Sequence, residues 1–219
     1  PKSEFQKRPE RSAPEKKRVI IFSPHPDDDV ISMGGTFDRL VEQGHEVHVV
    51  YQTSGNIAVS NHEALKFAEI GLVFNSKNDT YIKIIDFINQ KSSSVSDIIE
   101  LRNLKAQIRQ KESLGATRFL GLPDNQVHFL NLPFYETGTI KKSLLSKKDV
   151  EMMVAKIEEI QPHQIFAAGD LADPHGTHKV CLDSLFLALK EIKHKPFMDD
   201  CWVWLYRGAW HEWDIHEID

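Results

Sequence analysis

Short apolar runs that suit buried strands alternate along the chain with amphipathic stretches of helical period. The strand-like runs are residues 18–23, 45–53, 127–132, 163–169 and 202–206. The stretches of helical period are residues 33–44, 150–160 and 178–192. Strands that alternate with helices pair in parallel, because each helix returns the chain to the same edge of the sheet. The pattern therefore predicts an α/β protein of three layers, a Rossmann-like parallel sheet with helices on both faces.

Residues 57–115 interrupt this alternation. They contain two stretches of helical character, at 63–72 and 98–114, and a polar joint at 91–97. Such a helical insertion is either a lid over a site or additional helical packing. We expect packing.

Length and composition limit the class of protein. A chain of 219 residues corresponds to one or two domains at about 150 residues each. Its 41% hydrophobic and 27% charged residues exclude a disordered chain. No apolar run reaches the roughly 18 residues of a membrane span, so we expect no membrane partner. Two cysteines, Cys181 and Cys201, are too few for a disulfide framework, which favours a reducing compartment and a cytoplasmic location.

The N-terminal segment differs from the rest in charge. Residues 1–18 hold seven Lys or Arg and three acids, so this segment carries +4 and the remainder carries −9. The net charge of −5 argues against a nucleic-acid partner. The prolines of the segment and its lack of apolar residues favour a solvated linker over a basic binding arm. Because the chain begins with Pro, we expect residues 1–17 to link an N-terminal domain of a longer protein to one domain at 18–219.

A histidine and three carboxylates follow the first predicted strand, where ligands bind in open parallel sheets. These residues are His25, Asp27, Asp28 and Asp29. Three acids so close together repel one another, and burial increases the cost. A bound cation neutralises them most simply. The alternative is a polar cap in which Asp28 or Asp29 caps the following helix.

A second cluster follows the strand predicted at 163–169. His175 and His178 are three residues apart at a helix start, so they share one face. In a parallel sheet both junctions lie at the same edge, so histidine and carboxylate from the first cluster and histidine from the second make a three-ligand site. Three protein ligands plus water are typical of catalytic zinc. Spacing alone leaves open whether Asp27 or Asp28 is the ligand and which is the base.

These motifs are similar to those of a known enzyme family. The chain has His25-Pro26-Asp27-Asp28 after a buried strand, then Met33-Gly34-Gly35-Thr36, Thr53-Ser54-Gly55, Arg109-Gln110-Lys111-Glu112 and Pro174-His175-Gly176-Thr177-His178. Over residues 18–206 it resembles the PIG-L/LmbE family of zinc-dependent N-deacetylases. It is more similar still to a PIG-L-type domain found behind a glucosamine-6-phosphate deaminase-like domain in some bacterial proteins.

The resemblance implies zinc, or another divalent transition metal, on His25, Asp28 and His178. It implies that Asp27 is the general base toward the attacking water. His175 is then the group that stabilises the oxyanion or protonates the leaving amine. The chemistry is consistent, because a carboxylate beside a metal accepts a proton and a cationic imidazole stabilises developing negative charge.

Four other residues are candidates for supporting roles. Arg109 is a candidate anchor for a sugar hydroxyl or phosphate, and the alternative is an ion pair with Glu112 on its own helix. Histidine ligands of metals are usually oriented by further polar groups. Three carboxylates are expected to orient or support the ligands: Asp29, Asp170 and Asp173.

We therefore expect a zinc-dependent hydrolase that removes the N-acetyl group from an N-acetylglucosaminyl-type amino sugar and releases acetate. The amino-sugar substrate follows from the resemblance alone. The alternative is a non-catalytic module that binds an amino sugar, or a partner, for an attached enzyme. A phosphorylatable receiver domain ranks third, because its acceptor Asp and its Lys are not evident. A homo-oligomer is compatible with the sequence.

Overall fold

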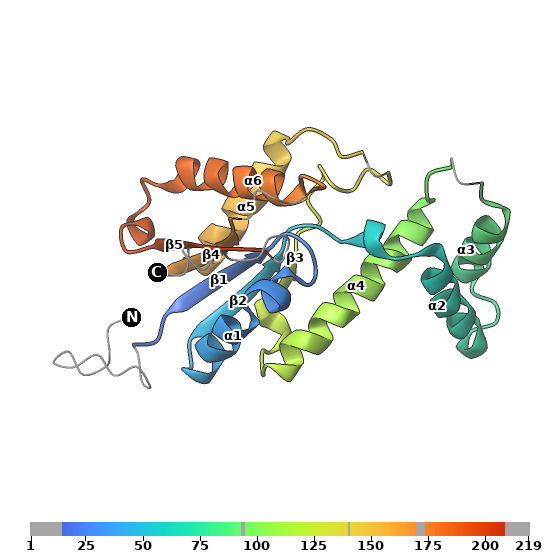
Figure 1. Cartoon of the computed structure of the whole chain (residues 1–219), viewed down its shortest axis with the longest axis horizontal. Coiled ribbons are helices and arrows are strands. Elements are labelled where there is room, and N and C mark those ends of the chain that lie inside the picture. The colour runs from blue at the N-terminus through green and yellow to red at the C-terminus, as the bar shows by residue number, and fades with distance from the viewer. Residues whose placement is uncertain (1–14, 93–94, 140, 170–173, 209–219) are drawn as a thin grey trace.

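The computed structural model describes residues 15–92, 95–139, 141–169 and 174–208. A five-stranded parallel sheet lies at the centre of the molecule, in the order β3-β2-β1-β4-β5 (Figure 1). The strands are β1 (Arg18–Ser23), β2 (Glu46–Tyr51), β3 (Val127–Phe129), β4 (Gln164–Ala168) and β5 (Trp202–Tyr206). The parallel α/β prediction is confirmed, although the strands predicted at 45–53 and 127–132 are shorter than expected.

Helices cover both faces of the sheet. They are α1 (Asp28–Glu42), α2 (Asn61–Phe74), α3 (Asp79–Gln90), α4 (Ile99–Phe119), α5 (Lys147–Ile160) and α6 (Thr177–Ile192). Short 3-10 turns are η1 (Asn56–Ala58), η2 (Asp124–Gln126) and η3 (Pro196–Met198). Helices α5 and α6 cover one face, and α1 with part of α4 covers the other (Figure 1). None of the helices in the described part of the chain has the length and apolar character needed to cross a membrane.

Strand β1 shows why the chain folds in three layers. Its apolar side chains alternate in direction, as in any strand. Ile20 and Phe22 pack toward α5 and α6, whereas Val19 and Ile21 pack toward α1. All four side chains are fully buried, and burial of each contributes about 1.5–3 kcal/mol to folding. A strand that is apolar on both faces requires helices on both faces.

Helix α1 begins earlier than predicted. The sequence predicts a helix over 33–44, but α1 starts at Asp28 and departs from helical geometry at Met33. Its first turn holds Asp28 and Asp29, where the helix dipole favours negative charge. The N-cap position belongs to Asp27, whose side chain makes no capping hydrogen bond. Asp28 and Asp29 lie past the N-cap position, so neither is the N-cap residue of the helix.

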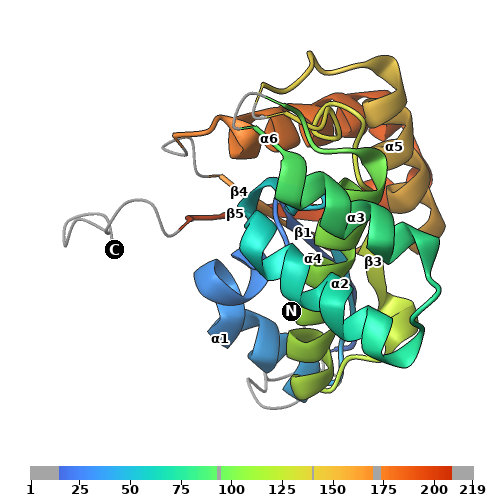
Figure 2. The ribbon, with the colours of Figure 1, turned by 90° about the vertical axis from the view of Figure 1, so that its right-hand side faces the viewer.

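The insertion contains three helices, not two. The prediction misses α3, although apolar residues recur in it at helical spacing and the Asn78 side chain caps its first turn. The three helices pack through a small core of buried residues: Ala64, Ala68, Ile84 and Leu101. Figure 2 shows α2 and α3 side by side at the end of the molecule nearest the viewer, against α4. The helices of the insertion thus pack through a core of their own, and α4 continues from it toward the sheet.

Candidate metal centre and active site

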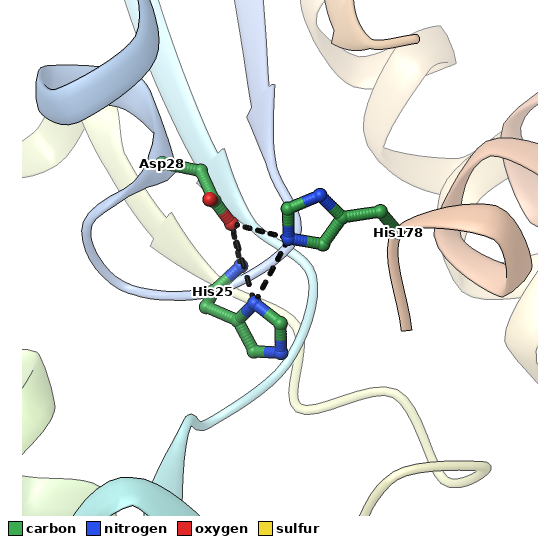
Figure 3. Close-up of side chains that lie close together, drawn as sticks. All are labelled: His25, Asp28 and His178. Carbon is green, nitrogen blue, oxygen red and sulfur yellow. Dashed lines mark hydrogen bonds and ion pairs between the residues drawn. The ribbon is translucent and has the colours of Figure 1, made fainter. Parts of the chain in front are cut away.

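The two sequence clusters meet between β1 and β4, where the order in which strands are added to the sheet reverses. From β1 the chain proceeds through β2 and β3 toward one edge, whereas β4 and β5 extend the sheet the other way. Loops that leave the carboxyl ends of β1 and β4 therefore diverge, and ligands bind in the crevice between them. His25 and Asp28 follow β1, and His178 lies in the first turn of α6 after β4 (Figure 3).

The three side chains place one donor atom each at the corners of a triangle. His25 Nδ1 and Asp28 Oδ2 are 3.3 Å apart, and His178 Nε2 is 3.2 Å from each of them. Tetrahedral zinc with bonds of about 2.0–2.1 Å needs ligand atoms roughly 3.3–3.4 Å apart. The three distances between the donor atoms match this requirement. Two imidazole nitrogens and one carboxylate oxygen are also ligands that zinc binds in proteins. These residues therefore fit a zinc ion with a fourth position open.

The surroundings of Asp28 favour its ionised form, which is the form that binds a metal. Burial of this carboxyl opposes its charged form, but hydrogen bonds from His178 and His25 outweigh that effect and hold its pKa well below the usual range. The backbone N–H of His25 also donates to Asp28 Oδ2 at 2.9 Å. Asp28 is therefore ionised at neutral pH, as a metal ligand must be.

The loop that carries these residues is braced from β1 and β2. Thr53 donates from its hydroxyl to the carbonyl of Pro24 at 2.7 Å, just beyond the end of β2. Ser23 donates to the carbonyl of His25 at 2.5 Å. The same two carbonyls also accept from backbone N–H groups, that of Pro24 from Thr53 at 3.1 Å and that of His25 from Asp27 at 2.8 Å. Together these bonds fix the direction in which the loop leaves the sheet.

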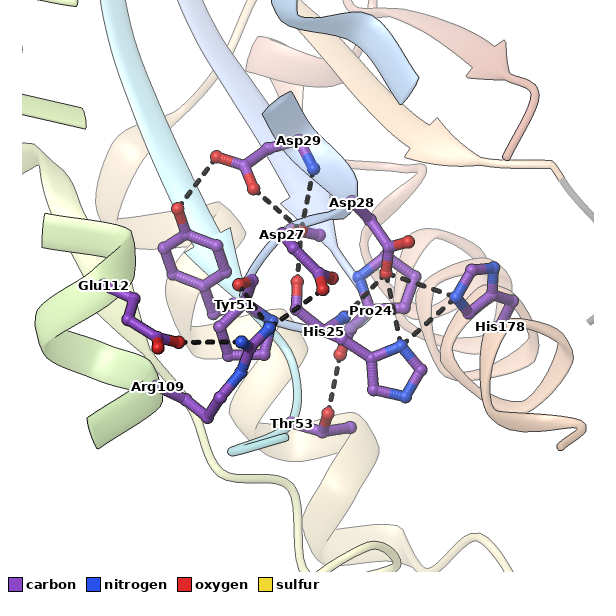
Figure 4. Close-up of polar contacts among 12 residues, drawn as sticks. Pro24, His25, Asp27, Asp28, Asp29, Tyr51, Thr53, Arg109, Glu112 and His178 are labelled. Atoms are coloured by element: carbon purple, nitrogen blue, oxygen red, sulfur yellow. Dashed lines mark hydrogen bonds and ion pairs between the residues drawn. The ribbon is translucent and has the colours of Figure 1, made fainter. Parts of the chain in front are cut away.

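Asp29 supports the same loop from the protein interior. Its carboxylate is fully buried and accepts a hydrogen bond from Tyr51 Oη at 2.8 Å (Figure 4), and its backbone N–H donates to Ser23 Oγ at 3.1 Å. Burial raises the pKa of Asp29 to about 6. The hydrogen bonds of Asp29 go to Tyr51 and Ser23 and not to the side chains of the three candidate ligands, so its support is indirect. Asp170 and Asp173 lie outside the described residues.

Asp27 and Arg109 form an ion pair beside the triangle. Arg109 Nη2 donates to Asp27 Oδ2 at 2.8 Å and to the carbonyl of Pro26 at 3.0 Å (Figure 4). Its Nη1 donates to Glu112 Oε2 at 2.7 Å. The pair with Glu112 is one of the two alternatives that the sequence offers for Arg109, whereas the sequence does not predict the contact with Asp27. No sequence signal joins positions so distant, because the contact exists only once α4 reaches the sheet edge.

A cleft of about 370 Å³ opens above these groups. Its walls include six polar residues: His25, Asp27, Arg109, Tyr135, Lys142 and His175. His175 is exposed, and its backbone carbonyl accepts from Lys142 Nζ at 3.2 Å. The Tyr135 ring stands edge-on to His25, with centroids 5.9 Å apart. Sequence reasoning misses Tyr135 and Lys142, because the loop between β3 and α5 contains no motif.

Comparison with known proteins places the chain in a family. The PIG-L model, described as GlcNAc-PI de-N-acetylase, matches residues 20–189. The chain belongs to the PIG-L family. A glucosamine-6-phosphate deaminase-like protein of Bacteroides thetaiotaomicron is 49% identical over 230 residues. That match covers the whole chain but only 35% of the relative, so the chain spans about a third of that protein's length.

Solved structures share the PIG-L fold at lower identity. The N,N'-diacetylchitobiose deacetylase from Pyrococcus horikoshii has a TM-score of 0.58 and 21% identity, over 88% of this chain and 61% of that one. The conserved protein TT1542 from Thermus thermophilus has a TM-score of 0.56 and 18% identity, over 90% and 68%. GalB, the 4-carboxy-2-hydroxymuconate hydratase from Pseudomonas putida KT2440, has a TM-score of 0.50 and 19% identity, over 83% and 59%. These similarities establish the fold alone, which deacetylases and a hydratase share.

Gly55 of this PIG-L chain allows the segment after β2 to lie close to the loop that carries His25. Its φ is +63°, and a Cβ there would lie 2.7 Å from Pro26 Cδ. We expect Gly55→Ala to lower the free energy of unfolding by about 1–3 kcal/mol, from backbone strain and steric conflict. Thermal denaturation followed by circular dichroism measures the effect.

Gly115→Ala in α4 is the matched control for that substitution. A Cβ at Gly115 meets nothing within 4 Å, and alanine is the better helix former. We expect this variant to melt at or above the wild-type temperature. If Gly55→Ala melts as high as Gly115→Ala, the close approach at Pro26 does not constrain the loop.

Proposed function

We propose that this chain is a zinc-dependent N-deacetylase that hydrolyses the acetamido group of an N-acetylglucosaminyl-type amino sugar and releases acetate. The observation that carries the proposal is the triangle of donor atoms from His25, Asp28 and His178, whose edges of 3.2–3.3 Å suit zinc. Family membership supports the reaction class. The family description names a GlcNAc compound and the Bacteroides relative's name includes glucosamine-6-phosphate, which supports the amino-sugar class.

The proposed roles divide between metal ligands and proton-transfer groups. Zinc bound by His25, Asp28 and His178 would supply a Lewis acid that polarises the amide carbonyl and acidifies water. Asp27 lies outside the donor triangle, with its carboxylate held by Arg109 at 2.8 Å. In this position Asp27 accepts the proton of the attacking water as general base. Arg109 fixes the orientation of that carboxylate, and it lines the cleft where a sugar hydroxyl would contact it.

His175 is proposed to act from another wall of the cleft. It precedes α6, and Lys142 holds its backbone carbonyl, so its position is tied to the loop after β3. A protonated imidazole there stabilises the oxyanion of the tetrahedral intermediate or donates a proton to the leaving amine. Asp170 and Asp173 are proposed to orient His175 or His178.

The surroundings of the domain are also proposals. We infer that residues 18–219 form a deacetylase domain of a longer protein, and that residues 1–17 link it to an N-terminal domain. This chain spans only 35% of the Bacteroides relative, which supports the part of the proposal that concerns a longer protein. The chain has two cysteines, Cys181 and Cys201, which are too few for a disulfide framework, and from this we also infer a reducing, cytoplasmic compartment.

Acetate release tests the proposed function. Zinc-loaded protein is incubated with N-acetylglucosamine, its 6-phosphate and N,N'-diacetylchitobiose, and acetate is measured by a coupled assay. We expect acetate from at least one of these compounds, loss of that activity on chelation and recovery when zinc returns. Zinc-loaded protein that binds these sugars but releases no acetate would instead support the non-catalytic module.

A further inference from the structure

A second cavity, of about 490 Å³, adjoins the active-site cleft and has basic walls. Ile57 in η1 lines both the cleft and the second cavity, so a ligand that extends past this residue occupies both. Four cationic side chains line the second cavity: Lys91, Arg102, Lys105 and Lys141. Asp97 is the acid among its lining residues, so the formal charge of this lining is positive.

Two of the cations share that single carboxylate. Lys105 is only 5% exposed, and its Nζ donates to Asp97 Oδ2 at 2.7 Å and to Asn61 Oδ1 at 2.7 Å. Lys91 pairs with the other oxygen of Asp97. One carboxylate neutralises one ammonium group, so this cluster, in which Lys105 is buried and Lys91 and Asp97 are partly exposed, has an unbalanced positive charge. Such a charge is costly away from water unless an anion accompanies it.

Arg102 adds a guanidinium that no described carboxylate neutralises. Its Nη1 donates to the carbonyl of Glu136 at 3.1 Å, and its Nε is buried without a hydrogen-bond partner among the described residues. A Cβ on Gly138 would lie 2.9 Å from this side chain, so glycine at that position leaves room for the guanidinium. The Glu136 carboxylate bonds instead to Asn56 and to the backbone of Ser54.

We propose that this second cavity binds a phosphoryl group of the substrate, so that the enzyme deacetylates a phosphorylated N-acetyl amino sugar. The deacetylation step in this inference rests on the proposed function, whereas binding of the phosphoryl group does not. A phosphoryl group carries about two negative charges and three acceptor oxygens, which suit several cations around one space. The guanidinium of Arg102 is the donor that recognises such oxygens with defined geometry.

Matched substrates test the proposal. We compare kcat/KM for N-acetylglucosamine with that for its 1-phosphate and 6-phosphate, in the wild type and in Arg102→Gln and Lys141→Met. Lys141 is exposed, so its variant keeps the fold even if Arg102→Gln disturbs the nearby loop. We expect the wild type to prefer one phosphorylated sugar at least about tenfold, and each variant to raise its KM about tenfold. Activity on the neutral sugar stays unchanged.

Lys83→Met is the control, because Lys83 is an exposed lysine of α3 that pairs with Glu100 and does not line the cavity. It should leave both activities unchanged. Equal kcat/KM for neutral and phosphorylated sugars in the wild type overturns the proposal. A stronger preference for N-acetylmuramic acid, which carries a carboxylate, also overturns the phosphoryl assignment.

Binding of pyrophosphate separates this proposal from the proposed function. Calorimetry on the intact protein should show binding that weakens about tenfold in Arg102→Gln and persists in His178→Ala, which lacks the metal centre. If no sugar is deacetylated but this pattern holds, the proposed function fails and the phosphoryl site stands. Binding that is lost in His178→Ala and kept in Arg102→Gln places the anion at the metal centre and overturns the proposal.

Discussion

Replacing His178 with alanine is expected to reduce zinc from about one ion per chain to less than about a tenth, and to lower kcat/KM for deacetylation at least a thousandfold. His178 is the donor that α6 contributes, whereas His25 and Asp28 come from one loop only three residues apart. Without it the triangle becomes a two-donor site, which holds zinc weakly. Elemental mass spectrometry after stripping and reloading gives the stoichiometry, and acetate release gives the rate.

Two further variants separate ligand loss from unfolding. His178 is buried, so His178→Ala also leaves a cavity and lowers the melting temperature. His25→Ala removes a partly exposed ligand and should lose zinc equally with less destabilisation. His194→Ala changes an exposed histidine elsewhere and should keep both zinc and activity. A folded His178→Ala that still binds one zinc per chain would rule out this ligand set.

The central part of the fold could be predicted because local pattern determines it. Runs with an apolar centre, such as residues 18–23, suit strands buried on both faces, and this places the polar cluster after β1 at the sheet edge. The same reasoning places His178 on that edge, and the structure brings it within 3.2 Å of His25. Parallel pairing places both motifs at one edge, and the direct pairing of β1 with β4 makes them neighbours.

The rest depends on contacts between elements, which local pattern does not encode. The partner of Asp27 is Arg109, on a helix whose path is set by packing against α2 and α3. The basic walls of the second cavity likewise gather Lys91, Arg102 and Lys141 from separate segments.

Asp27→Asn is expected to retain about one zinc per chain and to lower kcat by about 10²–10⁴-fold, the usual contribution of a general base. The amide keeps the shape of the side chain but cannot accept the proton of the attacking water. Zinc is retained because the donor triangle does not include Asp27. Asp38→Asn, an exposed carboxylate of α1, is the matched control and should leave kcat unchanged.

The two measurements on Asp27→Asn together distinguish the roles of the adjacent carboxylates. If Asp27 were the ligand and Asp28 the base, Asp27→Asn would lose zinc, whereas Asp28→Asn would keep it and lose only turnover. The structure favours the opposite assignment, since Asp28 Oδ2 lies 3.2 Å from His178 Nε2 and Asp27 is bonded to Arg109. Normal turnover in zinc-loaded Asp27→Asn would exclude Asp27 as the base, because no amide side chain can replace a carboxylate in proton transfer.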